Sequence, residues 1–155
     1  MRAIPLFLAA LLTLLGACQP PDPLPADLVA LNAAGQAAMA QADIPRTMAR
    51  VQAATSPEAK AQVMRESALA IGRARIALQD VKLASPEVRD LQGRMVSGFG
   101  KLGAGANGAA DAFEASATAD LESARRQMRE GQVEFIAAGQ DMVRLATERK
   151  VTLGG

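Results

Sequence analysis

Residues 121–145 read LESARRQMREGQVEFIAAGQDMVRL, and this stretch decides the fold because its apolar residues repeat every seven positions. Large apolar residues occupy one set of positions: Leu121, Met128, Phe135 and Met142. A second set, mostly small, follows three residues after each: Ala124, Gly131, Ala138 and Leu145. This is the a/d pattern of a helix that packs along a partner, as in a coiled coil or a helical bundle. The small d residues predict a close approach of the two helices.

The two preceding segments carry comparable stripes. In residues 88–112 the a positions of the heptad are occupied by Val88, Met95, Leu102 and Ala109. The d positions are occupied by Leu91, Gly98, Gly105 and Ala112. The segment before that carries two apolar stripes, Met64, Ile71 and Leu78 on one and Leu69, Ile76 and Leu83 on the other. These stripes lie about 140° apart around a 3.6-residue helix, so we expect this helix to contact two neighbours.

Helix starts divide the chain into four segments. Ser56-Pro57-Glu58 and Ser85-Pro86-Glu87 each combine an N-cap hydroxyl, a proline suited to the first helical position and an acid at the positive end of the dipole. Thr118 with Asp120 marks a weaker start, and the first segment opens at Ala26 or Asp27. We predict an all-α domain over residues 26–155, an antiparallel (up-down) four-helix bundle. Its first helix should be kinked near Pro45.

The composition excludes several classes of function. The 155 residues contain no His, Trp or Tyr and one Cys. Histidine-based metal and haem sites and Ser-His hydrolases therefore lack their parts, and we expect neither a metal or other cofactor nor enzymatic activity. The chain has 17 basic and 16 acidic residues, and removing Arg2 leaves 16 of each. Without net positive charge or aromatic residues for stacking, nucleic acid is not an expected partner.

The N-terminus has the features of an export signal. Arg2 precedes an apolar run from Ile4 to Leu15, broken only by Pro5 and Thr13, which is too short to be a permanent membrane span. The run ends in Leu15-Gly16-Ala17-Cys18, which resembles the lipobox of bacterial lipoproteins. The resemblance implies that residues 1–17 are a signal peptide and that Cys18 carries acyl chains such as palmitate. It does not extend beyond Cys18.

Residues 18–25 comprise the lipidated cysteine and a proline-rich tether. Four prolines within residues 19–25 favour an extended polyproline conformation, roughly 20 Å long at about 3.1 Å per residue. Two or three acyl chains on one residue would hold the protein stably on a membrane. Gln19, rather than Asp, after the cysteine resembles the sorting pattern for the outer membrane. We therefore expect a lipid anchor in the cell envelope, with the domain in the periplasm, at the outer membrane rather than the inner one.

Six glycines lie between residues 93 and 108, in a segment expected to be helical. Residues 98–103 and 103–108 both fit G-x-G-x-x-G, but no strand precedes them, so we do not expect a dinucleotide site. Gly98 and Gly105 fall on the d stripe, which predicts close helix contact. Gly100, Gly103 and Gly108 fall off it and are the candidate hinge, because each glycine costs a helix about 1 kcal/mol relative to alanine.

Two further groups of residues receive structural interpretations. Arg125, Arg126 and Arg129 are interleaved with glutamates at positions 122, 130 and 134, which is typical of a solvated helix face rather than of an anion-binding site. Four methionines lie on core stripes, and we interpret them as core filler and not as a copper site: Met64, Met95, Met128 and Met142.

Two hypotheses for function remain. The first is a non-catalytic interaction or structural module of the envelope that meets a periplasmic protein partner. The second is a carrier, which opens at the glycine-rich segment 98–108 to admit an apolar ligand or a partner's helix between its third and fourth helices. An exposed apolar patch or a preformed apolar cavity would favour the carrier, and a packed core under a polar surface would favour the first hypothesis.

Overall fold

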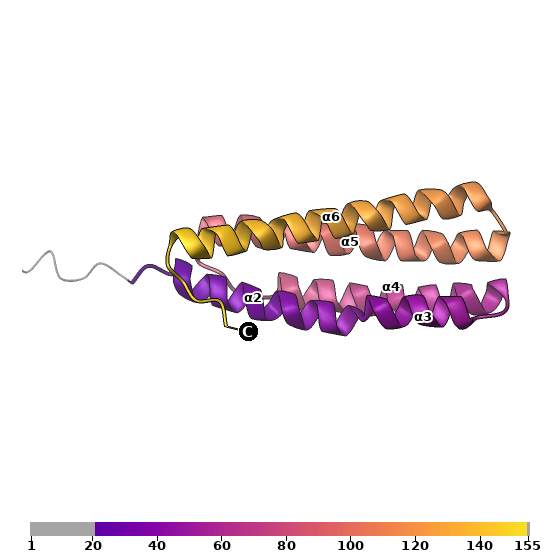
Figure 1. Ribbon diagram of the computed structural model, residues 1–155, viewed down its shortest axis with the longest axis horizontal. Helices are drawn as coiled ribbons and strands as arrows, with labels where there is room; N and C mark the ends of the chain where they lie inside the picture. The colour runs from indigo at the N-terminus through magenta and orange to yellow at the C-terminus, as the bar shows by residue number, and fades with distance from the viewer. Residues whose placement is uncertain (1–20, 155) are drawn as a thin grey trace, which may run out of the picture.

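The computed structural model describes residues 21–154, and all its regular secondary structure within that range is helical. Its helices are α2 (Leu24–Ala42), α3 (Ile44–Ala53), α4 (Pro57–Gln79), α5 (Pro86–Ala115) and α6 (Thr118–Glu148). They form an elongated helical bundle (Figure 1). In the described range no helix is both long and apolar enough to cross a membrane.

The helix starts follow the local sequence signals. The Ser56 hydroxyl accepts a hydrogen bond from the backbone N–H of Ala59 at 3.1 Å, and Pro57 and Glu58 begin α4. Ser85 precedes α5 without capping it through its own side chain. Leu24 and Pro25, which we assigned to the tether, already belong to α2. The Asp22 carboxylate accepts from the Leu24 N–H at 3.0 Å, and a proline is tolerated in the first helical turn.

The arrangement of the helices is seen most directly in Figure 1. α2 and α3 follow one another along one edge, α4 lies beside them, and α5 and α6 run together along the opposite edge. The most extensive contact joins α5 to α6, and the next joins α4 to α5. α2 touches α6 over a small area only. The side of the bundle between α2–α3 and α6 is therefore the least tightly closed.

Helical geometry is interrupted between α2 and α3. Asp43 has φ 39° and ψ 52°, a left-handed conformation in which asparagine and aspartate are the more tolerated non-glycine residues. Its N–H donates to the carbonyl of Met39 at 3.2 Å and closes the last turn of α2. Pro45 lies in the first turn of α3, where its missing N–H costs nothing.

A buried aspartate joins α2 to the α4–α5 connection. The Asp27 carboxylate accepts hydrogen bonds from the N–H groups of Ala84 and Ser85 at 2.7 and 2.6 Å. From the other side, the Gln92 amide donates to the carbonyls of Leu78 and Val81, both at 2.9 Å. Backbone groups of this connection, which would otherwise lack partners, are thereby satisfied.

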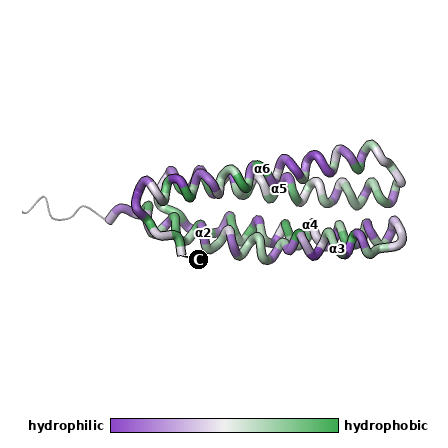
Figure 2. Tube along the Cα trace, in the orientation of Figure 1, coloured by the Kyte–Doolittle hydropathy of each residue, from purple (hydrophilic) through white to green (hydrophobic). Residues whose placement is uncertain are grey.

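The core runs along the inside of the bundle. Its largest fully buried side chains are Phe99, Leu28, Leu31, Leu78, Met95 and Val88. α4 contacts more than one neighbour, as predicted, since it packs against α2, α3 and α5. The second stripe does not make these contacts, because Leu69 and Ile76 are 65% and 54% exposed. Small residues beside the first stripe, such as Ala68 and Ala74, complete the contacts of α4 and leave Leu69 and Ile76 facing outward. Leu83 lies beyond the end of α4 and packs against the core as a partly buried side chain. Figure 2 shows the resulting mixture of hydrophilic and hydrophobic residues along every helix.

Candidate functional site

The glycines on the d stripes bring α5 and α6 into backbone contact. A Cβ added at Gly98 would lie 2.7 Å from the Gly131 carbonyl oxygen, and one added at Gly131 would lie 2.5 Å from that of Gly98. At Gly105 an added Cβ would lie 2.8 Å from the Ala124 carbonyl oxygen. Such distances leave no room for a side chain. The glycine-rich segment thus packs tightly against α6 and forms a continuous part of α5.

The candidate hinge residues lie within this same helix, and none of the described glycines has a positive φ. A Cβ at Gly100 would meet the Arg75 side chain at 3.7 Å, and a Cβ at Gly103 would meet Ile71 at 3.5 Å. At Gly108 it would meet the Cβ of Ala124 at 3.4 Å. These are ordinary or slightly tight van der Waals contacts, so alanine fits at all three positions.

The triple variant Gly100→Ala, Gly103→Ala, Gly108→Ala should therefore be more stable than the wild type. Each substitution adds up to about 1 kcal/mol through helix propensity and a less flexible unfolded chain. Urea unfolding monitored by circular dichroism measures the change. A loss of stability in the triple variant would mean that α5 needs these glycines for a conformation other than the continuous helix.

An apolar groove opens where α2 passes over α5 and α6. It has a volume of about 460 Å³. Its walls comprise Asn32, Gly35, Gln36 and Met39 from α2, Met95 from α5, and Phe135, Gly139, Met142 and Val143 from α6. Met39 and Val143 are 41% and 54% exposed at its mouth, whereas Met95 and Met142 are buried at its floor. We call this the first groove.

A second groove follows it along α6, on the side of α3, with a volume of about 300 Å³. Its lining comes from four helices: Ile44, Thr47 and Met48 (α3), Met64, Ser67 and Ile71 (α4), Leu102 and Ala106 (α5), and Arg125, Met128, Arg129 and Gln132 (α6). The floor therefore reaches through the gap between α3 and α6 as far as the core residues of α4 and α5. Apolar pockets of this kind are common ligand sites between the helices of bundles.

Methionines are concentrated in these grooves. The chain has seven, and the six other than Met1 all line one groove or the other: Met39, Met95 and Met142 in the first, and Met48, Met64 and Met128 in the second. Methionine side chains are flexible and polarisable, which suits a surface that adapts to an apolar ligand. Four of them lie on the predicted core stripes, and three of these are indeed buried. The sequence signal that we missed is that Met39 in α2 and Met48 in α3 face these core methionines across the grooves.

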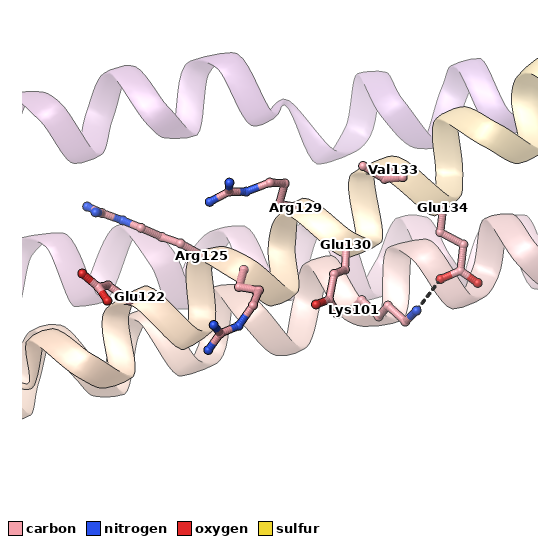
Figure 3. A pocket seen from close by; sticks show the side chains of 8 residues that line it. Lys101, Glu122, Arg125, Arg129, Glu130, Val133 and Glu134 are labelled. Carbon is pink, nitrogen blue, oxygen red and sulfur yellow. Dashed lines mark ion pairs between the residues drawn. The ribbon is translucent and has the colours of Figure 1, made fainter.

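The charged face of α6 is shown in Figure 3. Lys101 from α5 forms an ion pair with Glu134, with 2.7 Å between Nζ and Oε2, and this close pairing with the ammonium group lowers the pKa of the glutamate. Arg125, Arg126 and Arg129 are exposed and make no ion pair within residues 21–154. Arg125 and Arg129 also border the second groove, whereas Arg126 does not. The three arginines are exposed to solvent, as predicted, and two of them lie at the edge of an apolar groove as well.

The remaining predicted site, Cys18, lies outside the described residues. Among residues that are described, no group of three or more acidic or cysteine side chains is placed to hold a metal ion. No protein-family model matches the chain, and searches of curated proteins and of solved structures find no significant match.

Proposed function

We propose that the protein is a lipid-anchored periplasmic lipoprotein that binds an apolar group of a partner or ligand, without catalysis, in the two grooves beside α6. The observation that carries the binding role is the concentration of all six methionines after Met1 in these grooves. The anchor at Cys18 is supported by the lipobox-like sequence, and the position at the outer membrane by Gln19 after the cysteine. The role is that of an interaction module of the cell envelope.

For the fold we propose an up-down four-helix bundle in which α2 and α3 together count as the first helix. The interruption at Asp43, two residues before Pro45, supports a kink in that helix. A bent first helix would follow α6 less closely than a straight one. That geometry accounts for the open side on which the grooves lie.

The grooves bear on both of the functions considered from the sequence. A preformed apolar cavity favours binding of an apolar ligand or helix over a purely structural role. Entry between α5 and α6 has little support, because their backbones touch at Gly98, Gly105 and Gly131. In our proposal the ligand enters instead from the side of α2 and α3, where the packing is weakest.

The anchor is tested by replacing Cys18 with serine in the full-length precursor. The variant should lose acyl labelling, remain uncleaved and no longer fractionate as mature lipoprotein, because serine lacks the thiol that receives the lipid. Mass spectrometry of the wild-type N-terminus provides the direct measurement. An unmodified Cys18, or cleavage elsewhere, would contradict the proposal.

Binding is tested with an uncharged, environment-sensitive fluorescent dye and the purified mature protein. The dye should bind with a blue shift, and Gly139→Leu should weaken binding by about tenfold or more, because the added side chain fills the first groove. Gly93→Leu is the matched control. Both glycines have open space within 4 Å of an added Cβ, but Gly93 lines neither groove. Absence of dye binding, or equal losses in both variants, would refute the binding role.

A further inference from the structure

We infer that the grooves bind an amphiphile with one long apolar chain and an anionic headgroup, and that Arg125 and Arg129 bind the headgroup at the rim of the second groove. This inference rests on the proposed function, since it names the ligand class of the same grooves. It is carried by the position of two cationic side chains at the rim of an apolar groove.

The inner part of the second groove is suited to an acyl chain. Met64, Ile71, Leu102 and Ala106 form its floor and are each at most 6% exposed. No charged residue lies among the groove-lining residues of α4 and α5. An apolar chain entering here would be removed from water at about 25 cal/mol per Å² of buried surface.

The rim provides the charge. Arg125 and Arg129 are one helical turn apart, so their side chains lie on the same side of α6. Figure 3 shows both extending from α6, and neither is paired with a carboxylate within residues 21–154. The planar guanidinium group donates bidentate hydrogen bonds to carboxylate or phosphate oxygens. A headgroup at this position would place its chain over the apolar floor.

The two grooves follow one another along α6. Along α6, Arg129 is the rim arginine nearer to the first groove, and Val143 is the last residue of α6 that lines the first groove. The distance is about 21 Å at 1.5 Å per residue. In our proposal the chain fills the second groove, with its head kept in solvent beside the arginines, and any length beyond that groove extends along α6 toward the first.

An acidic amphipathic helix of a partner is the main competing occupant. A helix with its side chains is about 10–12 Å across. The second groove has a volume of only about 300 Å³ and is lined by α3 on one side and α6 on the other. A helix would rest on the rim formed by Met48 and Arg129 without reaching Met64 or Ile71, whereas a chain of methylene groups reaches them. The buried floor thus favours the amphiphile.

The test compares ligands that share a chain and differ in the head. Tetradecanoate and tetradecanol, below their aggregation limits, displace the neutral dye from the mature protein. The wild type should bind the carboxylate about tenfold or more tightly than the alcohol, and the preference should decrease with added salt. The variant Arg125→Gln, Arg129→Gln should bind the two equally and retain its affinity for the dye. The affinity of a lysophosphatidic acid of the same chain length is then compared with that of the carboxylate. Tighter binding of either one identifies a phosphate or a carboxylate as the preferred headgroup.

Arg126→Gln is the matched control, because it removes a neighbouring charge that lies outside the apolar groove. It should preserve the preference for the carboxylate. Equal affinities for carboxylate and alcohol in the wild type would overturn the inference, as would an equal loss of preference in the Arg126 variant. Displacement of the dye by an acidic amphipathic peptide but by none of the amphiphiles would also overturn it. In each of these outcomes the dye still binds, so the proposed binding function stands while the inference about the headgroup fails. Failure of the binding function is a different result, in which the dye itself does not bind.

Discussion

Replacing Phe99 with alanine should lower the free energy of unfolding by about 3–5 kcal/mol. Phe99 is among the largest fully buried side chains of the described residues and is 0% exposed. Its ring meets that of Phe135 edge to face, with 5.1 Å between centroids and 88° between planes. Alanine would remove the apolar contacts and leave a cavity between α5 and α6. Urea denaturation followed by circular dichroism measures the loss.

Phe135→Ala is the comparison variant for this experiment. Its ring makes the same aromatic contact, but it is only partly buried and borders the first groove. The loss should therefore be smaller than for Phe99→Ala. An equal or larger loss for Phe135→Ala would show that the centre of the core lies nearer to α6 than the structure places it.

The variant Gly131→Ala should lose about 3 kcal/mol of stability, the upper end of the range for overpacking a well-packed core. Its new Cβ would lie 2.5 Å from the Gly98 carbonyl oxygen and 2.8 Å from the Leu102 nitrogen. Both are backbone atoms, so no side chain can rotate away, and α5 and α6 must separate along their contact. Thermal and urea unfolding both report the change.

Gly139→Ala is the matched control in the same helix. An added Cβ there meets no atom within 4 Å, and the position is helical. This variant should gain up to about 1 kcal/mol from helix propensity. The two substitutions are chemically identical and occur eight positions apart in one helix. If Gly131→Ala lowers the free energy of unfolding and Gly139→Ala raises it, close helix contact at Gly131 is the cause of the difference. Stabilisation by Gly131→Ala would refute that contact.

Much of the fold could be predicted because its signals are local and repeated. The heptad stripes of residues 121–145 and 88–112 predicted which faces of α5 and α6 meet, and Gly98, Gly105 and Gly131 lie at that contact. The Ser-Pro-Glu sequences predicted where α4 and α5 begin. Both kinds of signal depend on residues within one or two turns of a helix.

The remaining features depend on contacts between segments that are distant in the sequence. Leu69 and Ile76 are as apolar as the buried stripe of α4, and only the positions of its neighbours leave them exposed. The start of α2 at Leu24 is an exception, because its signal is local: the Asp22 carboxylate accepts a hydrogen bond from the Leu24 N–H, two residues later, and we did not predict it. The grooves could not be predicted because a heptad pattern specifies which helices meet and contains no information on which ones stay apart.

The absence of buried residues in α3 has a consequence for the dynamics of the protein. None of its ten residues is fully buried, and only Ile44 and Val51 pack against the core as partly buried side chains. Local unfolding exposes little apolar surface in such a segment and therefore costs little free energy. α3 can thus detach as a unit while α5 and α6 remain held by their glycine contacts. Because α3 forms one wall of the second groove, the width of that groove would fluctuate while the core stays folded.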